Sequence, residues 1–245
     1  MTTYVAWEGP SQLDGSPIVL LVSMRTDGAN VKTGQVAQTY ILRADMKPTD
    51  ALREGQDTAI CGDCPFRSKA SGGTGACYVV VHQGPLSVWS AWKRGNAPRF
   101  DASMLAGWVL RLGTYGDPAA VPSHVWEPLV AASSGHTGYT HQWRQVWAQE
   151  YSRWCMASVE TTDDLALATA MGWRGYRAML PGVERTRGEM VCPASAEAGK
   201  RLTCAECLRC GGSDGPGSVS VAITIHGSMG LAQAKRGNLD EVMSS

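Results

Sequence analysis

The sequence predicts an α/β protein: a partial or complete parallel (β/α) barrel with an N-terminal β-hairpin and cysteine-rich metal-binding loops. Two β-rich runs separated by turn-forming residues open the chain, which indicates the hairpin. Apolar strand-like runs then alternate with helical runs, and this alternation is typical of parallel β–α units. Seven of the eight cysteines fall into two groups with metal-ligand spacing, which predicts the binding loops.

A chain of 245 residues can bury one sizeable core, so we expect one domain overall. Within it, residues 1–56 are the hairpin region, residues 57–227 the barrel-like region with both cysteine groups, and residues 228–245 a tail. Short connections favour a barrel over an open doubly wound sheet, which is the main alternative. Neither a G-x-G-x-x-G after a strand nor a G-x4-G-K-[ST] occurs, so no Rossmann dinucleotide site or P-loop is predicted.

The strands are predicted from short apolar runs rich in β-branched residues. Residues 18–23 and Val36–Arg43 form the hairpin, because the segment between them, RTDGANVKTGQ, is rich in turn formers. The later strands are expected at residues 77–81, 108–112, 137–140, 155–159, 176–180 and 219–225.

The helices are predicted from apolar residues at helical spacing. They are expected at residues 85–94, 119–132, 142–154 and 162–171. The last of these has Thr162 as a candidate N-cap and Gly172 as a candidate stop. Most of the nine tryptophans fall in these stretches, which favours packing of amphipathic helices over stacking on bases.

The cysteine spacing is the most specific chemical signal in the chain. The first group reads C-x2-C-x12-C and the second reads C-x11-C-x2-C-x2-C. Thiolates are the ligands that zinc and iron–sulfur clusters prefer, and a tight turn between the cysteines of C-x2-C brings two sulfurs onto one metal. The predicted ligands are Cys61, Cys64 and Cys77 in the first group and Cys192, Cys204, Cys207 and Cys210 in the second.

Disulfides and buried free thiols are the competing interpretations. No apolar signal-peptide region follows Met1, so we expect a cytoplasmic protein, in which C-x2-C is more often metal-binding or redox-active than a structural disulfide. Cys155 stands alone in an apolar run and is predicted to be a small buried hydrophobe.

The spacing also bears on the kind of metal. Three cysteines in C-x2-C-x2-C with a remote Cys192-Pro193 favour a [4Fe–4S] cluster over zinc at the second group. At the first group the spacing favours the cluster and zinc about equally, and one cysteine could be shared, with Cys192 completing that group.

Charge narrows the range of partners. The formal net charge is zero and the chain has no basic block, which argues against a protein that mainly binds the phosphate backbone of nucleic acids. A local basic patch is still compatible with this charge. The candidate basic contacts are Lys93, Arg94, Arg99, Arg174, Arg177, Arg185, Arg187, Lys200 and Arg201. No apolar run is long enough to span a bilayer, so we expect no membrane partner.

Polar side chains follow several predicted strands directly. Parallel barrels carry their chemistry at the carboxyl ends of the strands, so these side chains are candidates for one shared site. They are Tyr115 and Asp117 after residues 108–112, His141 after 137–140, Glu160 after 155–159 and His226 after 219–225. The alternatives are a helix cap for Asp117, helix first-turn electrostatics for Glu160 and structural roles for the histidines.

Four sequence runs resemble phage and mobile-element proteins of the "gene product 88" type, over roughly residues 57–227. These runs are RLGTYGDPAAVP, GYTHQW, CMASVET and CPAS-x3-G-x3-TCAECLRC. The resemblance implies a distant radical-SAM-like barrel, a cysteine-ligated iron–sulfur cluster or zinc, and a phage or plasmid context.

One strand end resembles radical SAM enzymes more specifically. Residues Tyr115, Gly116, Asp117 and Pro118 look like the GGEP-type strand end that holds the methionyl end of S-adenosylmethionine. The usual C-x3-C-x2-C loop is absent, and C-x2-C-x12-C stands in its place.

Two functional hypotheses follow. The first is an iron–sulfur, radical-SAM-like enzyme of a phage or mobile element, acting on an unknown substrate in the host cytoplasm. Its catalytic candidates are Asp117, His141, Glu160 and His226. The second is a non-catalytic zinc or iron–sulfur module that acts in nucleic-acid transactions of a mobile element.

Overall fold

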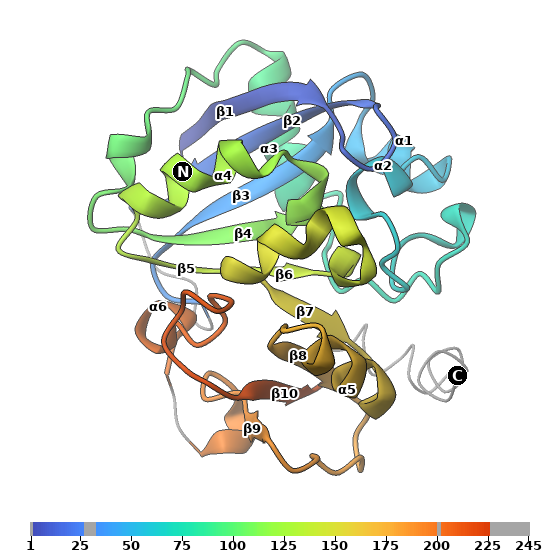
Figure 1. The fold of residues 1–245 in the computed structure, drawn as a ribbon. Helices are drawn as coiled ribbons and strands as arrows, with labels where there is room; N and C mark the ends of the chain where they lie inside the picture. Colours follow the sequence, from blue (N-terminus) through green and yellow to red (C-terminus); the bar gives the residue numbers. More distant parts are fainter. Residues whose placement is uncertain (1, 27–32, 200–201, 226–245) are drawn as a thin grey trace.

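The structure is a computed structural model that describes residues 2–26, 33–199 and 202–225. Its strands form two five-stranded sheets, which a single short segment connects (Figure 1). In this part of the chain no helix is long and apolar enough to cross a membrane.

The first sheet combines an antiparallel hairpin region with parallel strands. β1–β2 and β2–β3 are antiparallel, whereas β3–β4 and β4–β5 are parallel. Its spatial order is β1 (Thr2–Pro10), β2 (Pro17–Met24), β3 (Val36–Arg43), β4 (Val109–Tyr115) and β5 (Gly135–Thr137).

The second sheet is parallel throughout. Its spatial order is β6 (Tyr139–Thr140), β7 (Met156–Val159), β8 (Gly175–Met179), β10 (Ser220–Thr224) and β9 (Glu189–Val191). Because β5 and β6 flank Gly138 in one continuous segment, parallel neighbours follow one another from β3 to β8 in chain order. Both sheets are open at their edges within the described residues, so the structure confirms a parallel-rich α/β fold but does not show a closed barrel.

The helices connect these strands. The α-helices are α1 (Pro48–Arg53), α2 (Thr58–Cys61), α3 (Gly84–Lys93), α4 (Ser123–Ala132), α5 (Thr162–Ala170) and α6 (Cys204–Cys207). The 3-10 helices are Lys69–Ser71, Ala102–Leu105, Pro118–Ala120, Gln142–Arg144, Val146–Arg153 and Ala196–Ala198.

Several sequence predictions are confirmed with small shifts of their ends. The hairpin strands are β2 and β3, the helix at 85–94 is α3, and the helix at 162–171 is α5. The N-cap of α5 is Thr161 rather than Thr162, because the Thr161 hydroxyl accepts the N–H of Asp164. The run at 18–22 is fully buried on both faces of β2, which explains its continuous apolar character.

Other predictions are wrong. Residues 77–81 form no strand, because the Cys77 N–H is bonded to the Phe66 carbonyl and Val81 turns into the core. The segment 137–140 is divided between the two sheets, and residues 142–154 form two 3-10 helices instead of one α-helix.

Two strands were not predicted. β1 ends in Glu8, Gly9 and Pro10, which interrupt the alternation of apolar and polar residues that is typical of a strand. Pro10 is compatible with the strand because β1 lies at the edge of its sheet. β9 has three residues and lies at an edge of the second sheet, beside β10.

Gly138 makes the change of sheet possible. Its N–H is bonded to the Cys210 carbonyl at 2.9 Å, and its carbonyl accepts the N–H of Met156 at 2.9 Å. A Cβ at this position would lie 2.7 Å from the Cys155 sulfur and 3.0 Å from the Trp154 carbonyl oxygen. Cys155 is completely buried, as predicted, and fills the space that glycine leaves.

Gly138→Ala is therefore expected to lower the free energy of unfolding by about 1–3 kcal/mol, because overpacking forces neighbouring groups to move. The measurement is denaturant unfolding of the single variants and of Gly138→Ala/Cys155→Ala. The double variant should recover part of the loss, since it removes the closest contact. Additive losses would contradict this account of the junction.

A buried ion pair fixes the edge of the second sheet. Arg177 on β8 donates to both carboxylate oxygens of Glu189 on β9, at 2.8 and 2.6 Å. The Thr186 N–H and hydroxyl donate to the same carboxylate. Burial acts to raise the pKa of Glu189, but the bonds from Arg177 and Thr186 outweigh it and lower that pKa below its ordinary value.

This lowered pKa predicts a specific acid sensitivity. A carboxylate with a lowered pKa stabilises the fold above its unfolded-state pKa, and the contribution is lost as the pH falls through the folded-state pKa. We expect the free energy of unfolding to fall with pH below the ordinary value of 4.5, and to fall less steeply in Glu189→Gln. Glu8→Gln is the matched control, because Glu8 pairs with Arg99 at the exposed surface. Equal slopes in wild type and Glu189→Gln would refute the role of this pair.

Candidate functional site

The first cysteine group lies in a loop between β3 and α3. Cys61 ends the short helix α2, and the chain reverses at Gly62, whose φ of 52° and close approach to the Gln142 side chain exclude larger residues. The buried Asp57 holds the far part of the loop, because its carboxylate accepts the N–H and the hydroxyl of Ser68 at 2.8 and 2.7 Å.

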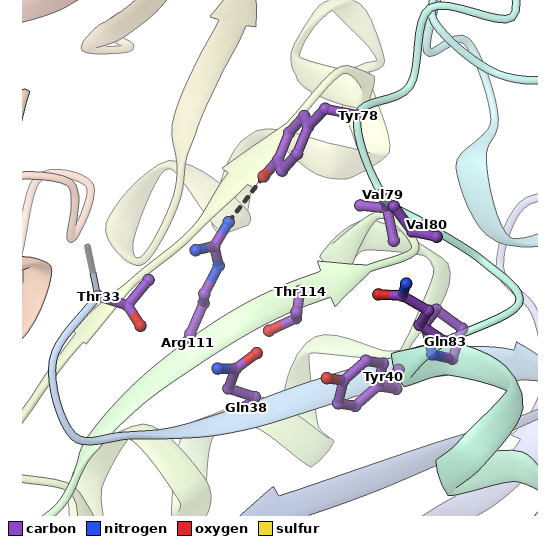
Figure 2. A pocket seen from close by; sticks show the side chains of 11 residues that line it. Thr33, Gln38, Tyr40, Tyr78, Val79, Val80, Gln83, Arg111 and Thr114 are labelled. Carbon is purple, nitrogen blue, oxygen red and sulfur yellow. Dashed lines mark hydrogen bonds between the residues drawn. The ribbon is translucent and has the colours of Figure 1, made fainter. Parts of the chain in front are cut away.

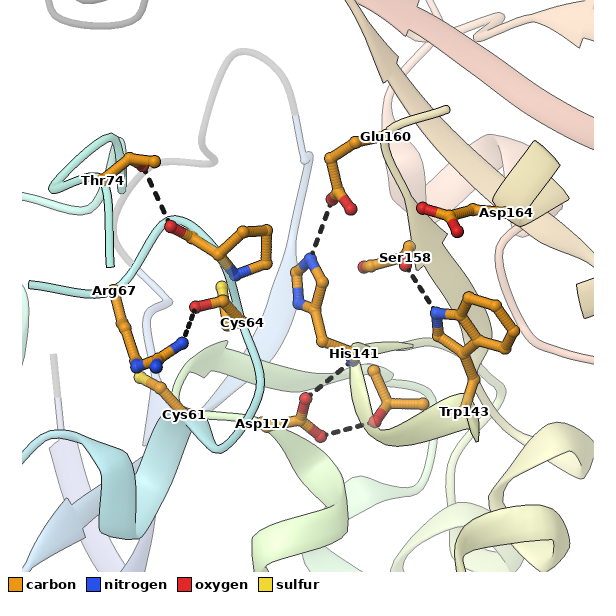
Figure 3. Close-up of polar contacts among 12 residues, drawn as sticks. Cys61, Cys64, Arg67, Thr74, Asp117, His141, Trp143, Ser158, Glu160 and Asp164 are labelled. Atoms are coloured by element: carbon orange, nitrogen blue, oxygen red, sulfur yellow. Dashed lines mark hydrogen bonds and ion pairs between the residues drawn. The ribbon is translucent and has the colours of Figure 1, made fainter. Parts of the chain in front are cut away.

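Backbone bonds close the loop around the cysteines. The Arg67 guanidinium donates to the Cys64 carbonyl at 2.8 Å, and Figure 3 shows this bond beside Cys61. The Thr74 N–H and hydroxyl both donate to the Pro65 carbonyl, at 2.8 and 3.0 Å. The loop is therefore folded around the cysteines by its own contacts.

The carboxyl end of β4 meets this loop. Gly116 has a φ of 86°, and a Cβ there would lie 2.7 Å from the Ile41 Cβ, so only glycine fits. The N–H of Asp117 then donates to the Ile60 carbonyl at 2.6 Å. This bond joins the strand end directly to the helix that carries Cys61.

Asp117 is both a cap and a connector. Its Oδ1 accepts the N–H of Ala119 at 3.0 Å, so the predicted capping role is confirmed. The same carboxylate accepts the Thr140 hydroxyl at 2.7 Å and the His141 N–H at 2.8 Å (Figure 3). Asp117 therefore ties the end of β4 to the end of β6.

His141 and Glu160 extend the site to the end of β7. The His141 Nε2 lies 3.0 Å from the Glu160 Oε1, and Figure 3 shows the imidazole between this carboxylate and Cys64. Burial acts to lower the pKa of His141, but Cys64 and Glu160 raise it well above its ordinary value. The structure thus brings Asp117, His141 and Glu160 together beside the first cysteine group.

The thiols of this group lie within each other's electrostatic influence. Burial first, and then Cys64 and Cys77, raise the pKa of Cys61 well above its ordinary value. Burial likewise raises the pKa of Cys77 to about 11. Uncompensated thiolates are therefore unfavourable here, and binding a cation would release their protons.

The second cysteine group is organised around α6. A capping box starts this helix, since the Thr203 hydroxyl accepts the Glu206 N–H and the Glu206 carboxylate accepts the Thr203 N–H. Leu208 ends it with a φ of 53°, so the chain turns before it reaches the buried Cys210. Burial, and to a lesser extent Cys192, Cys204 and Cys207, raises the pKa of Cys210 to about 12, and a bond from Tyr139 acts against them.

All eight cysteines lie in the described part of the chain, and no two of them form a disulfide. Among the described residues, no three Cys, His, Asp or Glu side chains are already gathered around one point as metal ligands. The donor types nevertheless fit an iron–sulfur cluster or zinc. Two buried oxygens without a hydrogen-bond partner, Tyr115 Oη near the first group and Ser195 Oγ near the second, support that fit.

His226 lies outside the described residues. Tyr115 is buried at the end of β4, and burial followed by the charges of Cys61 and Cys77 raises its pKa. Sequence reasoning missed Asp57 and Arg111, although a single arginine within the apolar run WVLRLGTY was a visible signal for the second.

Several basic residues proposed as nucleic-acid contacts have structural partners instead. Arg177 is 2% exposed and paired with Glu189, so it cannot reach a nucleic acid. Arg174 donates to three backbone carbonyls, those of Arg209, Gly212 and Val219. Lys200 and Arg201 lie outside the described residues.

The chain was compared with protein-family models, with curated proteins and with solved structures, and none of the three comparisons found a match.

Proposed function

We propose that this chain is an iron–sulfur enzyme of the radical-SAM-like kind. The observation that carries the proposal is the junction between two strand ends. The cysteine loop that follows β3 and the Tyr115–Pro118 turn that follows β4 are joined by the bond from the Asp117 N–H to the Ile60 carbonyl. The loop proposed to hold the cluster and the strand end proposed to bind the cofactor are therefore neighbours.

The order of the strands supports this proposal. β3, β4, the β5–β6 segment, β7 and β8 are parallel neighbours in chain order, and β10 continues the series. We interpret this series as an open, partial (β/α) barrel divided at Gly138. In such a barrel the residues that follow the strands share one face.

Cys61, Cys64 and Cys77 would hold a [4Fe–4S] cluster and leave one iron free for a ligand such as S-adenosylmethionine. When bound, the cluster supplies an electron. Zinc is the alternative occupant, and it would supply no electron.

The protein's own residues would then position the cofactor. The Gly116 carbonyl and the unpartnered Tyr115 hydroxyl offer hydrogen bonds to an amino or carboxylate group. Asp117 fixes this turn, since its carboxylate is already occupied by Ala119, Thr140 and His141. His141 holds a proton beside Cys64, and Glu160 orients the imidazole through Nε2.

The second group, with four thiols, would hold a closed centre. Its role is to stabilise the second sheet or to relay electrons, because four protein ligands leave no open position. The bond from the Gly138 N–H to the Cys210 carbonyl connects this centre to the junction between the sheets. The phage or mobile-element context rests on the resemblance described above.

The test is anaerobic purification with iron, sulfide and zinc analysis, followed by titration with S-adenosylmethionine. The proposal predicts about four iron and four sulfide per occupied centre, and a change in the cluster spectrum on titration. Zinc at both centres, or an intact cluster whose spectrum does not change with millimolar S-adenosylmethionine, would overturn the proposal. The non-catalytic metal-stabilised module would then be the better account.

A further inference from the structure

A cavity of about 240 Å³ lies between β3, β4 and the segment that follows Cys77. Figure 2 shows Gln38 and Tyr40 on β3, Arg111 and Thr114 on β4, and Tyr78 on the other side. The volume is below the roughly 300–1,000 Å³ of pockets for drug-sized ligands, so the cavity suits a smaller molecule.

Four side chains that line this cavity carry a polar group without a hydrogen-bond partner among the described residues. In the described part of the chain, the Gln38 amide and the Tyr40 hydroxyl make no hydrogen bond, and the buried Thr114 Oγ1 and Arg111 Nε have no partner. Burial acts first to raise the pKa of Tyr40, so its hydroxyl is a neutral donor at neutral pH. Buried polar groups are nearly always hydrogen-bonded, so the two buried ones, Thr114 Oγ1 and Arg111 Nε, indicate a polar ligand in this cavity.

The charge of the cavity is positive. Arg111 is the one charged side chain among the described residues that line it. Its Nη2 donates to the Tyr78 hydroxyl at 2.9 Å (Figure 2), and it forms no ion pair with a carboxylate of the described residues. A half-buried guanidinium with most of its five donors unused attracts an anion.

We propose that this cavity binds the carboxylate of a small organic acid, and that this acid is the substrate class of the enzyme, which rests on the proposed function above. A planar carboxylate matches the fork of one guanidinium. A phosphate dianion would leave excess negative charge against a single cation. The neutral donors Gln38, Tyr40 and Thr114 suit hydroxyl or carbonyl groups on the rest of the acid.

The cavity lies close to both cysteine groups. Tyr78 directly follows Cys77 of the first group in sequence. Arg111 lies within the electrostatic influence of Cys204 of the second group, as well as of Tyr139 and Tyr176. A carboxylate held by Arg111 would therefore anchor a substrate between the two centres.

The test uses 4-fluorobenzoate as the probe and neutral 4-fluorobenzamide as its isostere, measured by fluorine NMR on anaerobically purified protein. We expect 4-fluorobenzoate to bind at least about tenfold more tightly than the amide, and Arg111→Gln to remove that preference. Arg53→Gln is the matched control, because Arg53 is exposed on α1 and should change nothing. The benzoate–benzamide comparison on wild type needs no variant, so it decides the matter even if Arg111→Gln fails to fold.

Equal affinity for the two probes, or no binding of either, would overturn the proposal. Displacement of 4-fluorobenzoate by an equal concentration of inorganic phosphate would replace the carboxylate class with a phosphate site. Metal analysis of the same sample separates the two proposals. A metal-loaded protein without carboxylate preference contradicts the cavity alone, whereas a metal-free protein with that preference contradicts the iron–sulfur enzyme alone.

Discussion

If the proposed function holds, Cys64→Ser is expected to remove the proposed first iron–sulfur centre and, with it, the proposed binding of S-adenosylmethionine. Cys64 is half-buried and lies next to His141, and its carbonyl accepts a bond from Arg67, so its thiol is held in place within the loop. Three thiolates are the minimum that hold a [4Fe–4S] cluster with one open iron. We therefore expect a loss of about four iron per chain, and no change in any metal that the second group binds.

The measurement is iron and sulfide content per chain, together with the visible absorption of the cluster. Cys155→Ala is the matched control, because Cys155 is buried against Gly138 and belongs to neither group. That control should keep the full metal content. Unchanged iron in Cys64→Ser would show that the first group binds no cluster.

Asp117→Ala is expected to give the largest loss of stability of any single change proposed for the site. Three donors, the N–H groups of Ala119 and His141 and the hydroxyl of Thr140, would lose their acceptor in a buried setting. A buried donor without a partner costs about 1–3 kcal/mol, so we expect a loss of about 3–5 kcal/mol in the free energy of unfolding. Asp117→Asn should lose less, because its amide keeps one oxygen acceptor.

The control for Asp117→Ala separates the role of Asp117 as a helix cap from its role in joining the ends of β4 and β6. Asp101 also caps a 3-10 helix, through the Ser103 N–H, but its exposed side chain makes no hydrogen bond to a strand among the described residues. Asp101→Ala should therefore destabilise clearly less in the same denaturant unfolding experiment. A similar loss in the two variants would mean that Asp117 acts only as a cap.

Individual elements differ in whether their local sequence predicts them. The hairpin strands, α3 and α5 could be predicted because their signals are local: β-branched runs, helical spacing and a capping threonine. β1 could not, because an edge strand depends on its partner β2 and tolerates Gly9 and Pro10. The division of residues 137–140 at Gly138 likewise depends on contacts with Cys155 and Cys210, which are distant from Gly138 in the sequence.

The candidate site divides in the same way. By itself the sequence determined which side chains could carry chemistry, since cysteine spacing and polar residues after apolar runs are properties of the chain. Only the tertiary structure decided that Asp117 joins the ends of β4 and β6 and that His141 lies between Glu160 and Cys64. It also decided that Arg111 lines a cavity and has no carboxylate partner among the described residues, whereas Arg177 forms an ion pair with Glu189. The physical reason is that hydrogen bonds and ion pairs between distant residues depend on how strands are ordered in the sheets, and local sequence does not encode that order.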